Sequence, residues 1–191
     1  MLFLKHVYPG PDVLQLALKG YLQQKFPDYI EDMEANEFIN LFTSQWSGPV
    51  SISLTANNHP LVLIICMQLL SRMKNYRGTA LASVRAAIFR TFGAHNLPNI
   101  PTDNTGVKLN EWKKDPKVIR CHAMLFEENE AGMYWSGVIA RNAFKVALDK
   151  PISNHHLAFT LAVCDIILNP KSTGIKCTEK AMQRRLKHYL V

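Results

Sequence analysis

Only one stretch of this chain alternates apolar and polar residues in the manner of a β-strand. Val50, Ile52 and Leu54 alternate with polar neighbours, and the nearest candidate partner, residues 107–109, is weak. A single strand cannot form a sheet. We therefore expect an all-α or nearly all-α fold, a compact helical domain of about seven to eight helices with at most one short β element near 50–55.

Apolar residues recur at helical spacing through most of the remaining chain. The most apolar helix should begin at Pro60 and is apolar on all sides through Leu70, which places it at the centre of the core. It should end before Gly78, after which Thr79 caps a shorter helix. The stripe of that shorter helix comprises Leu81, Val84, Ile88 and Phe92. Further helices are expected at 12–24, 28–44, 115–128, 132–149, 154–168 and 178–190.

The domain organisation follows from the positions of proline, glycine and polar residues. Residues 1–10 are predicted to form an extended N-terminal arm, because Pro9-Gly10-Pro11 separates them from the first helix. Residues 11–191 should form a single helical domain. The helical pattern is lost over 93–115, and a link of that length is usually functional or mobile, so we expect a flexible segment there.

Cysteine usage and hydropathy bear on location. The four cysteines include no CxxC pair, and the chain begins without a basic region followed by an apolar one. These features favour a reducing, cytoplasmic setting. The longest apolar run, 61–67, is about half of the roughly 20 residues that a membrane-spanning helix needs. We therefore expect no membrane insertion.

The net charge of +7 is unevenly distributed. Residues 1–71 hold three Lys/Arg against six Asp/Glu, residues 72–126 hold ten against three, and residues 127–191 hold nine against six. An acidic first third followed by a basic middle and end suits a polyanionic partner, and also head-to-tail contact between subunits.

Three basic patches are candidate nucleic-acid-binding sites, because arginine forks hold phosphates and mixed basic and aromatic residues suit single strands. The first surrounds a turn between two helices and comprises Arg72, Lys74, Tyr76, Arg77 and Arg85. The second adjoins the flexible segment and comprises Lys113, Lys114, Lys117 and Arg120, extended by Arg141 and Lys145. The solvated end of a helix is the alternative for the first patch, although its tight cluster of cations favours binding.

The third patch lies on the last helix. At about 100° per residue, Met182, Leu186, Tyr189 and Leu190 share one side of that helix. The opposite side carries Lys180, Arg184, Lys187 and His188. One side can therefore dock on the core while Lys180, Arg184 and Lys187 face phosphates. A solvated terminal helix, whose lysines complement its dipole, is the alternative.

Asp165 is the only charged residue between Lys150 and Lys171, inside an apolar helix. Because a buried carboxylate is costly unless it is paired, we expect a cationic partner, with Arg85 or Arg141 as candidates. A structural ion pair is the favoured role, ahead of a catalytic one.

The motifs that accompany common enzyme classes are missing. The sequence contains no GxxxxGK[ST], GxGxxG, GxSxG or HExxH motif and no calcium-binding loop. Cys121 and His122 are adjacent and so point to different faces of a helix, which disfavours a metal pair or a nucleophile–base couple. We expect no enzymatic activity, cofactor, metal or small-molecule substrate.

A helical chain with a basic centre, an apolar arm and no catalytic signature resembles the small coat proteins and nucleoproteins of RNA viruses in general character, without an aligned motif. That resemblance implies a non-enzymatic assembly protein that coats single-stranded RNA with little sequence specificity, self-associates through its N-terminal arm and resides in the virion. A helical protein–protein interaction adaptor, with the acidic segment 28–37 in the contact, is the alternative. An enzyme with a site assembled from dispersed residues is a third hypothesis.

Overall fold

The computed structural model describes residues 60–102, 106–172 and 174–190, together with residues 16, 17, 19, 20, 23 and 24. This described part contains the six helices α5 to α10 and no strand, which confirms the all-α prediction for it. The chain divides into two units, residues 1–76 and residues 77–191 (unit 2).

Several predicted features fall partly or wholly outside the described residues. The N-terminal arm, the acidic helix at 28–44 and the β element near 50–55 lie outside them. The six described residues within the predicted helix at 12–24 are all helical. In the portion that the structure describes, no helix has the length and apolar character needed to cross a bilayer.

Helix α5 spans Pro60–Gly93 without interruption, so the prediction of two helices separated at Gly78 is wrong. Gly78 lies on an exposed part of α5 and keeps a negative φ. A glycine inside a helix costs only about 1 kcal/mol relative to alanine, whereas proline would break the hydrogen-bond ladder. The apolar stripe beyond Gly78 is buried at Val84, Ile88 and Phe92, and its contacts outweigh that cost.

Helix α6, Gly106–Lys114, occupies part of the segment that was expected to be a structureless link. It is followed after Asp115 by α7, Pro116–Met124. Asp115 caps α7 as predicted, because its Oδ1 accepts a hydrogen bond from the Lys117 N–H at 2.7 Å.

Helix α7 ends four residues before the predicted end at 128, because the chain turns back on itself. Asn129 Oδ1 accepts hydrogen bonds from the backbone of Ala131 and Met133, both at 3.0 Å. Gly132 sits at φ 71°, which a residue with a Cβ adopts poorly, and completes the reversal. The turn leads directly into α8, Trp135–Phe144.

The last three helices start near their predicted positions. Helix α8 stops at Lys145, which adopts a left-handed φ of 52°, so it is shorter than the expected 132–149. Helix α9 spans Asn154–Leu168, as predicted, and Ser153 caps it. Helix α10 spans Glu179–Tyr189 and is capped by the Thr178 hydroxyl.

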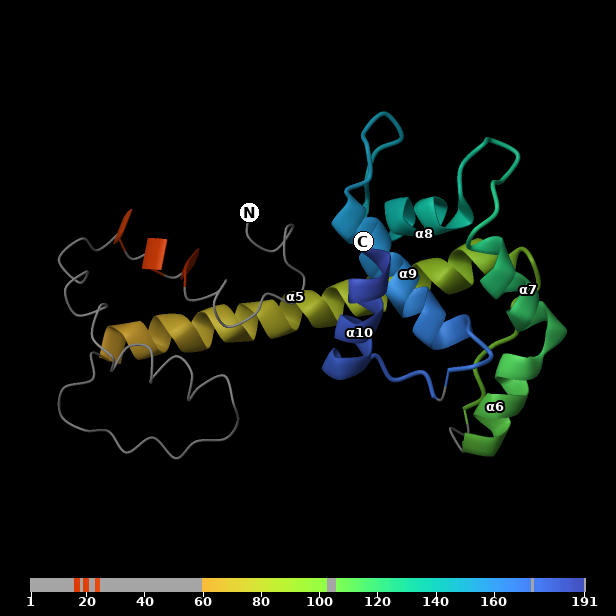
Figure 1. Cartoon of the computed structure of the whole chain (residues 1–191), viewed down its shortest axis with the longest axis horizontal. Helices are drawn as coiled ribbons and strands as arrows, with labels where there is room; N and C mark the ends of the chain where they lie inside the picture. The colour runs from red at the N-terminus through yellow and green to blue at the C-terminus, as the bar shows by residue number, and fades with distance from the viewer. Residues whose placement is uncertain are drawn as a thin grey trace. The chain divides into compact units, whose positions relative to one another are not determined.

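Helix α9 is the centre of unit 2. Helices α7, α8 and α10 all pack on it, and α6 packs on α7 (Figure 1). Nine of the fifteen residues of α9 are buried, which is why its sequence is apolar on every side. The side chains of residues 60–70, which were predicted to lie at the centre of the core, are outside those that the structure describes.

Replacing Phe92, which is fully buried, with alanine should lower the free energy of unfolding by about 3–5 kcal/mol, because the cavity left behind cannot collapse completely. Phe126 is 52% exposed, and Phe126→Ala is the matched control, with an expected loss below about 1 kcal/mol. Urea unfolding followed by circular dichroism measures both. Equal losses in the two variants would contradict the assignment of the core.

Candidate functional site

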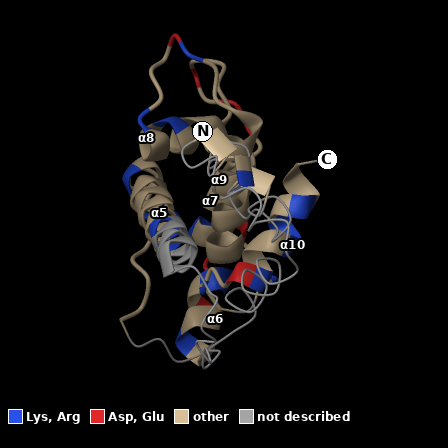
Figure 2. Cartoon of the chain, turned by 90° about the vertical axis from the view of Figure 1, so that its left-hand side faces the viewer, with Lys and Arg blue, Asp and Glu red and all other residues tan. Residues whose placement is uncertain are grey.

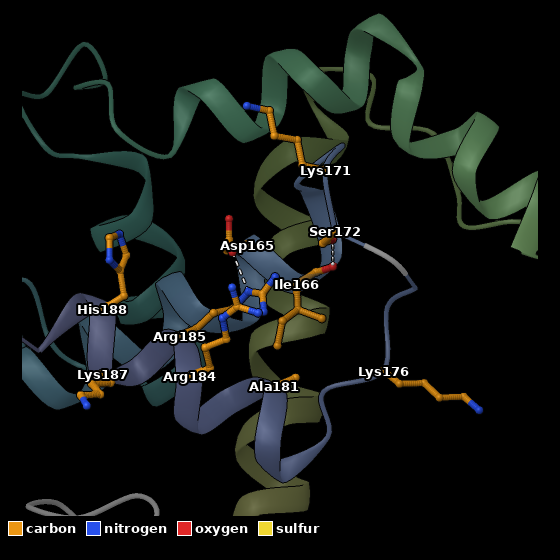
Figure 3. A pocket seen from close by; sticks show the side chains of 10 residues that line it. All are labelled: Asp165, Ile166, Lys171, Ser172, Lys176, Ala181, Arg184, Arg185, Lys187 and His188. Atoms are coloured by element: carbon orange, nitrogen blue, oxygen red, sulfur yellow. Dashed lines mark hydrogen bonds and ion pairs between the residues drawn. The ribbon is translucent and has the colours of Figure 1, made fainter.

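A cavity of about 740 Å³ opens between the C-terminal end of α9, the loop 169–178 and α10 (Figure 3). We call it the cationic cavity. Its lining residues are Asp165, Ile166, Lys171, Ser172, Lys176, Ala181, Arg184, Arg185, Lys187 and His188. Five of these side chains are lysine or arginine and one is a carboxylate, so the cavity attracts anions.

The loop that forms one wall of the cavity is determined by its sequence. Helix α9 cannot continue through Pro170, which has no backbone N–H to donate. Asn169 Oδ1 accepts a hydrogen bond from the Lys171 N–H at 2.8 Å and closes a turn. Gly174, at φ 72°, turns the chain again before Thr178 caps α10. Lys171 and Lys176 thereby extend from the rim in Figure 3.

Asp165, the carboxylate of the cavity, is bound by residues from three elements. Its Oδ2 accepts a hydrogen bond from Arg185 Nε of α10 at 2.6 Å. Its Oδ1 lies 3.3 Å from His122 Nε2 of α7 and accepts from Asn169 Nδ2 at 2.7 Å. Burial raises the pKa of Asp165, but these hydrogen bonds outweigh burial and hold the pKa well below its usual range.

The predicted ion pair of Asp165 is therefore present, but with a partner other than those expected. The partner is Arg185, because α10 packs along α9 and places it against the carboxylate. Arg141 donates instead to the carbonyl oxygens of Ala147 and Lys150, at 2.6 and 2.9 Å.

Lys113 cannot take part in a nucleic-acid surface, so this candidate is corrected. Its side chain is completely buried, and Nζ donates to the carbonyl oxygens of Ile166 at 2.8 Å and Ser172 at 3.2 Å and contacts the Ser172 hydroxyl. Burial, and then the positive charge of Arg185, lower the pKa of Lys113 to about 8. Lys113 shares the buried face of α6 with Leu109 and Trp112, which explains its orientation.

Carboxylates neutralise two further candidates. Arg120 binds Glu127 with both terminal nitrogens, and the Nη2–Oε2 distance is 2.7 Å. Arg77 has a largely buried side chain, and its Nη1 lies 3.7 Å from Glu179 Oε1. The positive charge of each guanidinium is therefore partly compensated, so each would attract a phosphate less strongly than an uncompensated arginine.

The remaining candidates are exposed but do not all converge. Figure 2 shows lysine and arginine on α5, α6, α8 and α10, separated along the ribbon by uncharged and acidic residues. Of the candidates predicted from the sequence, the cationic cavity includes Arg184 and Lys187. The exposed candidates elsewhere in unit 2 are Arg85, Lys114, Lys117, Lys145 and Lys180. Arg72, Lys74 and Tyr76 are exposed and belong to the other unit.

The sequence prediction missed Lys171, Lys176 and Arg185 of the cavity. A signal was present, because residues 171–191 hold six lysines and arginines against one acidic residue, Glu179. The helical wheel assigned the cations of α10 to one side of the helix. It did not show that the preceding loop supplies further cations to the same cavity.

The cysteine thiols of unit 2 are not activated. Burial raises the pKa of Cys121, Cys164 and Cys177, which is opposite to the shift that makes a cysteine nucleophilic. Across the described ranges, no three histidine, cysteine, aspartate or glutamate residues come together in a way that could hold a metal ion.

Comparisons of the chain with protein-family models, with curated proteins and with solved structures found no match. We therefore base the inference of function on the chemistry of the cationic cavity and its surroundings.

Replacing Lys113 with methionine should lower the free energy of unfolding by about 2 kcal/mol near neutral pH, because several buried acceptors lose their donor. The folded-state pKa of about 8 lies below the unfolded value of 10.5, so the unfolded chain holds this proton longer. Stability contributed by Lys113 therefore increases as pH rises from 8 to 10.5.

Urea unfolding at pH 7, 9 and 10.5 tests this dependence. The difference in stability between the native protein and Lys113→Met should widen with pH, whereas Lys114→Met, at the exposed neighbour, should match the native protein throughout. A difference that stays constant or narrows would show that the Lys113 pKa is not lowered.

Proposed function

We propose that this chain is a non-enzymatic nucleic-acid-binding assembly protein, of the coat or nucleocapsid kind, that coats single-stranded RNA with little sequence specificity. The observation that carries the proposal is the cationic cavity, which is lined by five lysine and arginine residues and by one carboxylate that is already bound by three protein groups. A cavity with an excess of cations favours phosphate groups.

The dimensions and chemistry of the cavity fit a nucleic-acid backbone. Its volume of about 740 Å³ lies within the roughly 300–1,000 Å³ of pockets that bind small organic ligands, so one or more nucleotide units fit. His188 provides the one aromatic ring of the lining. Contacts are therefore expected mainly with phosphates, which position the chain without reading its sequence.

The assembly part of the proposal comes from the general resemblance to viral coat proteins and from the division of charge between the first third of the chain and the rest. Residues 1–10 would dock on a neighbouring subunit, and the protein would act in the cytoplasm or in a virion. Size-exclusion chromatography with and without RNA tests this part. A monomer under both conditions would contradict it.

Binding to a fluorescent single-stranded RNA of about 20 mixed nucleotides should weaken by about tenfold to a hundredfold between roughly 50 and 200 mM KCl, because each neutralised phosphate of a single strand contributes about 0.7 to the slope of log K against log salt. Fluorescence anisotropy measures the affinity. An adaptor that binds protein should show little RNA affinity at any salt concentration.

The double variant Arg184→Ala, Lys187→Ala should weaken binding at least about tenfold and reduce the salt slope by about 1.4, because two phosphate contacts are lost. Its matched control is Arg90→Ala, Lys150→Ala, which removes the same charge from two exposed positions outside the cavity. The control should stay within about twofold of the native affinity. Equal effects of the two double variants would show that the cavity contributes only its net charge and is not a specific binding site.

A further inference from the structure

Arg185 differs from the other cations of the cationic cavity in how it is held. The side chains of Lys171, Lys176, Arg184 and Lys187 belong to exposed residues. The Arg185 side chain is only 23% exposed, and its Nε is bound to Asp165 Oδ2 at 2.6 Å (Figure 3). Arg185 is therefore the cation of the cavity whose position is defined before any ligand arrives.

Asp165 is itself fixed in place. Its side chain is 15% exposed, and its two oxygens are bound by His122 of α7, Asn169 at the end of α9 and Arg185 of α10. A carboxylate bound from three elements cannot rotate freely, so the guanidinium that it holds has a defined orientation as well.

The Arg185–Asp165 contact uses Nε and leaves the rest of the guanidinium fork for a ligand. Within the described part of the chain, neither Nη1 nor Nη2 of Arg185 makes a hydrogen bond. A planar guanidinium that is anchored on one edge can bind two oxygens of one phosphate with its other donors. Holding it in advance reduces the conformational entropy lost on binding.

We propose that Arg185 is the phosphate-binding residue of the cationic cavity and that Asp165 is its positioning residue, a role that rests on the proposed function and specifies how its site works. The ligand group is a single backbone phosphate diester, bound by the terminal nitrogens of Arg185. The exposed lysines and Arg184 attract the polymer by charge, whereas Arg185 makes the directed contact.

The direction in which Asp165→Asn changes the RNA affinity distinguishes a positioning role of Asp165 from simple charge pairing with Arg185. Asp165 places a negative charge in a cavity that binds an anion. On charge alone, Asp165→Asn would strengthen RNA binding. If Asp165 orients Arg185, the same substitution weakens binding, because the fork loses its anchor while the net positive charge increases.

The experiment measures affinity for the same RNA at one fixed salt concentration. Asp165→Asn is expected to bind at least about fivefold more weakly than the native protein. Arg185→Lys keeps the charge but loses the fork, and should bind at least about tenfold more weakly. The matched control, Arg90→Lys at an exposed position outside the cavity, should stay within about twofold.

Thermal unfolding of each variant shows whether it is folded. If Asp165→Asn does not fold, the comparison of Arg185→Lys with Arg90→Lys decides the question. Equal affinities of these two variants, or native or tighter binding by folded Asp165→Asn, overturn the proposal and leave the ion pair with a structural role. Native protein without salt-dependent RNA binding overturns the proposed function as well. Loss of affinity in Arg184→Ala, Lys187→Ala with no effect of Arg185→Lys overturns this inference alone.

Discussion

The packing of α7, α8 and α10 in unit 2 depends on the burial of α9. Helices α7, α8 and α10 cover it on separate sides, and α6 is attached through α7. Because α9 is apolar around its whole circumference, it gains stability only when it is enclosed, so the surrounding helices fold around it. The end of this enclosed helix, where the polar groups of the last turn need partners, is also where the cationic cavity lies.

Two charged side chains, those of Lys113 and Asp165, lie at the C-terminal end of α9, and their charges are stabilised in different ways. Lys113 arrives from α6 and satisfies carbonyl oxygens at the C-terminus of α9, where a helix dipole favours a cation. Asp165 belongs to α9 itself and meets the same dipole unfavourably, so the positive charge of Arg185 of α10 offsets its charge and His122 of α7 contacts it. As a result of these contacts, the Lys113 side chain is buried, whereas the Arg185 side chain lies at the cationic cavity.

The sequence predicts local structure well where caps and apolar spacing agree, and less well where a side chain faces an unexpected partner. Ser153 and the apolar run after it define α9, whereas α6 was missed because Leu109 and Trp112 are its only large buried apolar residues. Their spacing places Lys113 on the same face, which was a readable sign that it turns inward. Arg185 follows Met182 by three residues and so lies near the core-facing side of α10, whereas the prediction included only cations on the opposite side.

The enclosure of Lys113 also makes it a chemical reporter. Reagents that modify amines need access to Nζ, and that atom is covered by the end of α9 and by the Ser172 region. Exposed lysines of the same chain should react quickly, whereas Lys113 should react only after its contacts with the end of α9 are broken. The rate at which it is modified therefore measures how often Lys113 becomes exposed, and comparison with the rate of global unfolding shows whether this contact opens by itself.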